Sequence, residues 1–121
     1  MDNMNNEVKS LQGATSNEIA DFIAETLDAK KGKDVKVIKV GDKTVIADYF
    51  VIANGTSSTH VRALADEVEY KMGQAGINPL HTDAGDGRSW IVLDYANVIV
   101  HIFDREAREF YNLDRLYTEF E

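Results

Sequence analysis

Cysteine is absent from the sequence, and proline and tryptophan occur once each. Without cysteine, disulfide bonds, thiolate metal sites and cysteine nucleophiles are excluded. No apolar run approaches the roughly 20 residues that a membrane-spanning helix needs. The first residues also lack the pattern of a secretory signal or a transit peptide. We therefore expect a soluble protein of the cytoplasm that makes no contact with a membrane.

Positive charge is also scarce. The 121 residues include 13 Lys and Arg against 21 Asp and Glu, which gives a formal net charge of −8. Because proteins that bind nucleic acid usually neutralise its phosphates with Lys and Arg, we expect little direct contact with nucleic acid. A negative long-range field instead attracts basic protein surfaces. A simple role in solubility is an equally open interpretation of the charge.

The composition and length predict one globular domain. The hydrophobic fraction is 44%, and 121 residues are enough to enclose a core. Residues 1–14 are polar and rich in asparagine, and we interpret them as a flexible tail. No repeat and no linker rich in Pro, Gly or Ser divides the rest, so residues 15–121 are interpreted as a single domain.

A first helix is predicted over residues 16–30. Thr15 and Glu18 have the spacing of a capping box, and apolar residues at helical spacing follow them. Gly32 is expected to end this helix in the left-handed conformation. A second helix is predicted to begin within residues 54–58, with one of the hydroxyls there as its N-cap, and to stop at Gly76 and Pro79; further helical material is expected from Arg105 onward.

Apolar and β-branched stretches predict strands over residues 35–40, 45–53, 89–95 and 98–103. The stretch 45–53 alternates little, which favours a central strand covered on both faces. The last two strands flank a tight connection and are expected to form an antiparallel hairpin. Residues 81–88 contain two glycines and predict a loop, with a short edge strand before it as an open alternative.

Side-chain alternation along the hairpin groups the candidate residues by face. Trp90, Val92 and Asp94 share one face, and Tyr95 belongs to the other. Trp90, the only tryptophan, is interpreted either as a core residue or as an exposed anchor, because tryptophan is enriched in binding hot spots. Asp94 either receives a basic partner or pairs with an arginine of this chain.

The turn at residues 54–58 has two interpretations. It follows a strand and begins a helix, so its amides could hold a phosphate, as a similar turn does in nucleotidyltransferases. However, it has no Walker lysine, and no Asp-x-Asp pair follows the helix to bind the two metal ions of that chemistry. We favour a structural helix cap at a turn that Gly55 permits, and we keep a nucleotide-binding enzyme as the alternative.

The three histidines have no metal-ligand spacing along a helix. They are His60, His81 and His101. A metal shared by His81 and Asp83 is possible, but a solvated loop is favoured there. His101 is interpreted as a half-buried, hydrogen-bonded side chain in an apolar strand. The sequence therefore predicts no catalytic, metal-binding or cofactor-binding residues.

The order of several sequence blocks resembles the Iojap-related ribosomal silencing factors of bacteria and organelles. The resemblance covers roughly residues 16–117. Its blocks are Asp48-Tyr49-Phe50-Val51-Ile52-Ala53-Asn54-Gly55-Thr56-Ser57-Ser58, Ser89-Trp90-Ile91-Val92-Leu93-Asp94-Tyr95, Val100-His101-Ile102-Phe103, Glu106-Ala107-Arg108-Glu109-Phe110-Tyr111 and Asn112-Leu113-Asp114. It implies an α/β fold with a mixed β-sheet flanked by helices, related to nucleotidyltransferases but without their catalytic carboxylates.

The resemblance implies a binding function without a reaction. Family members bind the large ribosomal subunit at its inter-subunit face, mainly through ribosomal protein fourteen, and block joining of the small subunit. Translation is thereby repressed when nutrients are scarce, and assembly of the large subunit can also be affected. A homodimer of the free protein is compatible with this function. The competing hypotheses are the nucleotide-binding enzyme and an acidic oligomerisation adaptor.

The same resemblance implies a set of partner-binding residues. We expect Trp90 to act as an anchor and Asp94 to pair with Lys or Arg of the partner. Further candidates are Tyr95, His101, Asp104 and Glu106.

Overall fold

A computed structural model of the chain describes residues 10–84 and 89–112, without the side chains of residues 110 and 111. The elements follow one another in the order α1-β1-β2-α2-β3-β4-β5-α3. Their bounds are α1 Ser16–Ala29, β1 Lys33–Lys39, β2 Tyr49–Gly55, α2 Ser58–Gln74, β3 His81–Asp83, β4 Trp90–Asp94, β5 Val98–Asp104 and α3 Arg105–Tyr111. The predicted α/β class is therefore confirmed.

The strands form one mixed sheet in the order β1-β2-β5-β4-β3. β2 and β5 are parallel, whereas the other neighbouring pairs are antiparallel. The predicted β4–β5 hairpin is confirmed, and Ala96 in its turn has a φ of 71°. Every residue of β2 after the first is buried, as expected for a central strand.

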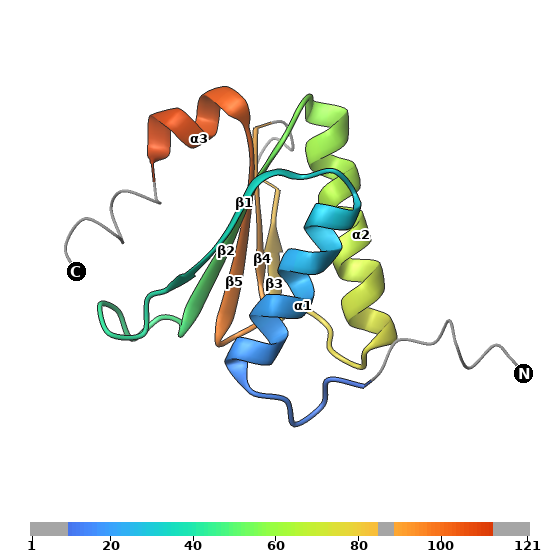
Figure 1. Cartoon of the computed structure of the whole chain (residues 1–121), viewed down its shortest axis with the longest axis vertical. Helices are drawn as coiled ribbons and strands as arrows, with labels where there is room; N and C mark the ends of the chain where they lie inside the picture. The colour runs from blue at the N-terminus through green and yellow to red at the C-terminus, as the bar shows by residue number, and fades with distance from the viewer. Residues whose placement is uncertain (1–9, 85–88, 113–121) are drawn as a thin grey trace, which may run out of the picture.

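Two layers of side chains cover the sheet. α1 and α2 lie on one face, and α3 lies at one end of the other face (Figure 1). Ile91, Leu93 and Tyr95 pack under α1 and α2, while Trp90 and Val92 pack on the opposite face with Phe103 and Ile52. The predicted separation of the β4 side chains between the two faces is confirmed.

Helix α1 begins where the sequence predicted. The Thr15 amide donates to Glu18 Oε1 at 2.9 Å, and the Glu18 amide donates to Thr15 Oγ1 at 3.2 Å, which completes the capping box. The prediction for Gly32 was wrong, because Lys31 takes the left-handed position with a φ of 67°. A Cβ on Gly32 would lie 2.9 Å from the Leu27 carbonyl oxygen, so glycine is needed there for close approach.

The predicted strand over 45–53 begins too early. Its first residues belong to a loop, and Val45 and Ile46 are 104% and 66% exposed. The amides of Lys43 and Thr44 donate to the Val40 carbonyl, which turns the chain away from the sheet. Strand pairing resumes only at Tyr49, so an apolar stretch was mistaken for a longer strand.

The ends of α2 agree with the prediction. Ser57 is its N-cap, and Gly76 follows its C-terminus with a φ of 92°. Leu11 and Gln12, which we placed in the flexible tail, hydrogen-bond to the carbonyls of Ala75 and Gly76, so ordered chain extends N-terminal to the predicted boundary.

Some predictions fall on residues 1–9, 85–88 or 113–121, which lie outside the described residues. They concern most of the tail, the two loop glycines and the apolar residues after Asn112. The open question at residues 81–88 is answered in part, since β3 is a three-residue edge strand. Within 10–84 and 89–112, no helix is long and apolar enough to cross a membrane.

Candidate functional site

Trp90 is held in place at the first position of β4. Its ring stacks on Phe103, the residue opposite it on β5, with the ring centroids 5.1 Å apart. Its indole N–H donates to His101 Nδ1 at 3.1 Å. The side chain remains partly exposed. A fixed aromatic ring that reaches solvent is suited to anchor a partner, because little side-chain entropy is lost on binding.

His101 lies beneath Trp90 and is 7% exposed. Its Nδ1 accepts the indole hydrogen bond, so the proton of the neutral ring is on Nε2. Burial lowers the pKa of His101 to about 4. The Phe50 ring contacts His101 edge-on, with the centroids 4.7 Å apart. His101 therefore supports Trp90 as a neutral ring and is poorly placed to touch a partner itself.

Two candidate carboxylates lie at the same end of the sheet as Trp90. Asp104 follows Phe103 on β5, and its amide donates to the Ser89 carbonyl at 2.9 Å. Its carboxylate caps α3 by accepting the Ala107 amide at 2.8 Å. Glu106 is exposed in the first turn of α3. The structure thus places an aromatic side chain and two acidic residues at the same end of the sheet.

Asp94 and Tyr95 are not part of this group. Asp94 ends β4, about 13 Å along the strand from Trp90, and its carboxylate accepts the Ala96 amide at 2.8 Å in the hairpin turn. Tyr95 faces α1 and α2 and is 6% exposed. Burial, followed by the charge of Glu69, raises the pKa of Tyr95. A partner cannot reach Tyr95 without disturbing the core.

Gly55 allows β2 and α2 to approach closely. A Cβ at Gly55 would lie 2.7 Å from the Val61 amide nitrogen and 2.8 Å from Val61 Cγ2. Ser57 caps α2 by accepting the His60 amide at 3.1 Å. Gly55 is therefore needed because β2 and α2 pack closely at the turn, and the Ser57 hydroxyl is needed to cap α2.

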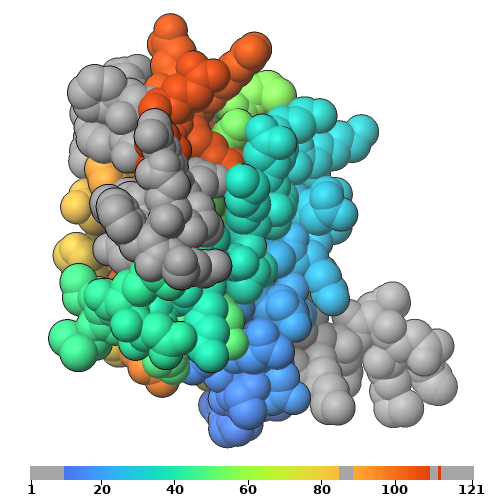
Figure 2. All heavy atoms as spheres, turned by 60° about the vertical axis from the view of Figure 1, so that its left-hand side comes forward, coloured from blue at the N-terminus to red at the C-terminus, as the bar shows by residue number. Residues whose placement is uncertain are grey.

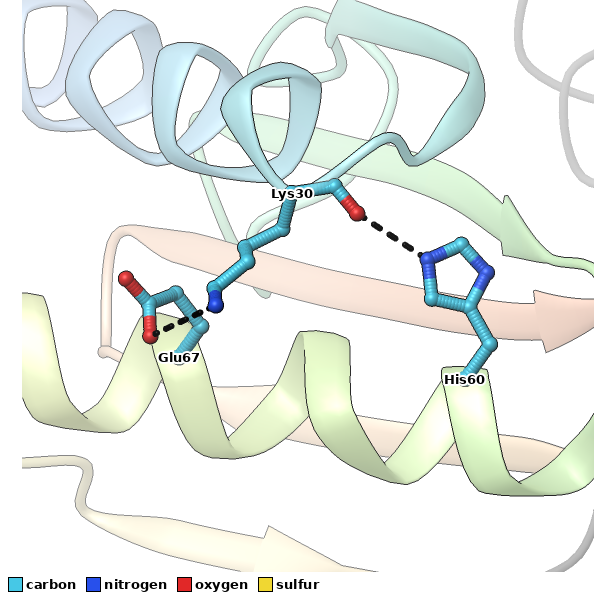
Figure 3. Close-up of polar contacts among 3 residues, drawn as sticks. All are labelled: Lys30, His60 and Glu67. Carbon is cyan, nitrogen blue, oxygen red and sulfur yellow. Dashed lines mark hydrogen bonds and ion pairs between the residues drawn. The ribbon is translucent and has the colours of Figure 1, made fainter.

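His60 fills the place that a phosphate would take at the Thr56 amide. The Thr56 N–H donates to His60 Nδ1 at 2.9 Å, so the ring donates through Nε2 to the Lys30 carbonyl at 3.0 Å. Figure 3 shows His60 of α2 directed at the end of α1, where Lys30 also lies 4.0 Å from Glu67. This geometry favours the structural interpretation of the turn. The role of His60 was not predicted, because its partner lies 30 residues earlier.

No group of three or more His, Asp or Glu side chains that could hold a metal occurs among residues 10–84 and 89–112. His81 and Asp83 lie on the exposed strand β3, and Asp83 pairs with Val92.

A cleft of about 850 Å³ was also missed by the sequence reasoning. It lies where β2 ends, between the beginning of β1 and α3, and four basic side chains line it: Lys33, Lys36, Arg105 and Arg108. These residues are distant in sequence. The net negative charge of the chain gives no indication that basic residues gather in one place.

Known proteins resemble this chain over most of its length. The family model described as ribosomal silencing factor during starvation (RsfS) matches residues 13–121. A ribosomal silencing factor RsfS of Haemophilus influenzae is 38% identical over 100 residues, which cover 83% of this chain and 98% of that protein. The mouse mitochondrial assembly of ribosomal large subunit protein 1 is 30% identical over 101 residues, 81% of this chain and 44% of that protein.

A solved structure has the same fold. The crystal structure of a Chromobacterium violaceum protein superposes with a TM-score of 0.81 at 28% sequence identity. The match covers 85% of this chain and 86% of that one.

Proposed function

The chain belongs to the family of ribosomal silencing factors, and from this membership we propose that it binds the large ribosomal subunit and prevents the small subunit from joining. The contact is ribosomal protein fourteen of the large subunit, and the result is repression of translation when nutrients are scarce. The protein acts in the cytoplasm by occupying a surface, without catalysing a reaction. The name of the mouse relative, which refers to the large subunit, supports the choice of particle.

The observation that carries the proposal is the group formed by Trp90, Asp104 and Glu106. The indole ring is fixed by Phe103 and His101 and still reaches solvent. The acidic residues at the same end of the sheet can pair with Lys or Arg of a basic ribosomal protein. In such an interface the buried aromatic side chain supplies affinity, and the charges supply association rate and register.

The other candidate residues take lesser roles in this proposal. His101 positions Trp90 and does not touch the partner, since it is buried beneath the indole. Asp94 lies on the same face at the far end of β4, where it extends the acidic surface if the interface covers the whole strand. Tyr95 is left out, because its side chain belongs to the core under α1 and α2.

Co-sedimentation with purified large subunits, small subunits and joined ribosomes tests the proposal. We expect retention on large subunits alone and inhibition of subunit joining, followed by light scattering. Trp90→Ala should weaken binding by about 2 kcal/mol or more, at least about 30-fold in affinity. Circular dichroism of the variant checks that the fold is kept.

A charge reversal with a matched control tests the acidic contribution. Glu106→Lys should slow association with the large subunit, because a like charge would face the basic partner. Glu25→Lys makes the same change on the exposed surface of α1 and should have a much smaller effect. Failure of the wild-type protein to bind any ribosomal particle would contradict the proposed function.

A further inference from the structure

The loop between β1 and β2, residues 40–48, carries two adjacent aliphatic side chains into solvent. Val45 is 104% exposed and Ile46 is 66% exposed, whereas Ala47 beside them is 5% exposed. A single exposed apolar side chain is ordinary on a protein surface. Two exposed neighbours in one loop form an apolar projection, and the contact proposed above does not use it.

Asp48 holds the base of this loop in one shape. Its carbonyl accepts the Val40 amide at 2.9 Å across the base of the loop, and its amide donates to the Asn97 carbonyl at 2.8 Å. Its carboxylate accepts the Ser16 hydroxyl at 2.7 Å, which ties the loop to the first residue of α1. The loop is therefore fixed both to the sheet and to the helix layer.

Val45 and Ile46 are thus presented by an ordered backbone. Within the loop the Ile46 amide donates to Thr44 Oγ1 at 3.1 Å. Both exposed side chains are β-branched, so few rotamers are open to them before or after binding. Their burial against a partner costs little conformational entropy, and such preorganisation increases affinity.

The loop borders the same face of the sheet as Trp90. Val40 and Ala47 belong to the apolar cluster against which Trp90 and Val92 pack. Figure 1 shows the loop on the side of the sheet away from α1 and α2, at the end opposite α3. In Figure 2, which brings this side forward, the orange atoms of α3 and the green atoms of the loop lie at opposite ends.

A partner of ordinary size that covers Trp90 also reaches the loop. Trp90 pairs with Phe103 near the end of β5, whereas the loop is bonded to Asn97, just before β5 begins. The strand between them is about 20 Å long. A standard interface of about 800 Å² per partner is roughly 30 Å across, so one contact surface spans both ends of the face.

Acidic residues accompany the apolar pair, as they accompany Trp90. Asp42 and Asp48 outnumber Lys43 in the loop, and both are exposed. Asp94 lies at the same end of the sheet, because the turn that follows it contains Asn97, to which the loop is bonded. This combination favours a basic protein surface with an aliphatic depression over the phosphates of RNA or of anionic lipids.

We propose that Val45 and Ile46 are a second anchor, which contacts the same basic protein of the large subunit as Trp90 does. The inference rests on the proposed function and extends its contact surface along the sheet face from one end to the other. It also gives Asp94 a place in the interface, at the end of the second anchor rather than at the end of Trp90.

Truncation of the apolar pair tests the second anchor. Val45→Ala combined with Ile46→Ala should weaken binding to purified large subunits by about tenfold. Thermal unfolding of this variant should match the wild type, because both side chains are exposed. Tyr70→Ala is the control and should bind like the wild type, since it truncates a 60% exposed side chain of α2, on the other side of the sheet.

Combination of the loop variant with Trp90→Ala tests whether one partner contacts both ends. The two sites share no contact, so the two losses of affinity should multiply. Full binding by the loop variant, with binding still weakened by Trp90→Ala, would overturn the second anchor and leave the proposed function intact. Absence of binding by the wild type to large subunits would contradict the proposed function and the inference together.

Site-specific crosslinking identifies what the loop touches. A photo-crosslinking amino acid replaces Ile46 in one variant and Glu106, at the Trp90 end, in another. With purified large subunits, both positions should crosslink to the same ribosomal protein. If position 46 instead crosslinks to a second copy of this chain, to ribosomal RNA, to a different protein or to nothing while position 106 crosslinks, the assignment is wrong.

Discussion

The neutral state of His101 depends on its burial and on the indole hydrogen bond that it accepts. The pKa of the folded ring is about 4, below the ordinary value of 6.5. Between these values the unfolded chain binds a proton that the folded chain does not. Stability from His101 is therefore fully present above pH 6.5 and is lost as the pH falls toward 4.

The expected size of this loss is roughly 3 kcal/mol in the free energy of unfolding. Urea unfolding followed by the fluorescence of Trp90 at several pH values measures it. His101→Phe removes the titrating group, so the variant should show a flatter dependence on pH over the same interval. If both proteins lose stability equally between pH 6.5 and 4, His101 is not the source.

Substitution by alanine is expected to have opposite effects on stability at Gly55 and at Gly73. Gly55→Ala should destabilise the protein by about 1–3 kcal/mol, because its Cβ would meet the backbone and side chain of Val61. Gly73→Ala should stabilise it by up to about 1 kcal/mol, since the nearest atom lies 3.8 Å away and alanine favours a helix. Thermal unfolding compares the two, and a shift of the same sign in both would contradict the prediction.

Sequence reasoning went only part of the way at this scale. The period of a strand was enough to group Trp90 with Val92 and Asp94 on β4, but not to say whether His101 of β5 lies on the same side of the sheet. It could not show that the nitrogens of Trp90 and His101 meet, because that contact depends on the register, which a two-residue turn sets. For Tyr95 the period of the strand assigned the face of the sheet. It could not show how completely α1 and α2 bury the side chain on that face.

Helices α1 and α2 are joined by His60, which bonds the end of one helix to the turn before the other. His60→Ala leaves the Thr56 amide and the Lys30 carbonyl without these partners, at a cost of about 1–2 kcal/mol. Hydrogen exchange should become faster at Thr56 and remain unchanged in β5. Uniform acceleration throughout the protein would indicate global destabilisation instead.

The bounds of elements were predicted well where a local motif sets them. The capping box at Thr15 and the left-handed Gly76 are contained in a few adjacent residues. At Val45 the apolar pattern continues, but the strand does not, because the partner carbonyl of Asn97 becomes available only to Asp48 and Tyr49. A long-range hydrogen bond cannot be deduced from a local pattern.

The edges of the sheet limit how two copies of the molecule could associate. β1 has three lysines and a bulge, and β3 has three residues, so neither edge suits strand pairing between copies. We expect any homodimer of the free protein to use the Trp90 face. Sedimentation should then show self-association of the wild type that Trp90→Ala removes and that large subunits compete away. A dimer that survives Trp90→Ala would place its interface elsewhere.

Net charge was informative for the whole molecule and misleading for one part of it. It correctly describes an acidic protein, but a total over 121 residues does not say where the charged side chains lie in the fold. The four basic residues of the cleft come from β1 and α3, which the sequence alone does not bring together. Only the parallel pairing of β2 with β5 places α3 beside the start of β1.

The parallel pair at the centre of the sheet also determines how the chain must fold during its own synthesis. Tyr49 pairs with Val98, so β2 has no partner on its inner side until β5 has been made. Such distant contacts close slowly, whereas the β4–β5 hairpin is local and can form early. A nascent chain that already contains β1, α2 and an open β2 edge is the species most exposed to misassociation. Truncation before Val98 should therefore yield an aggregating fragment rather than a smaller folded domain.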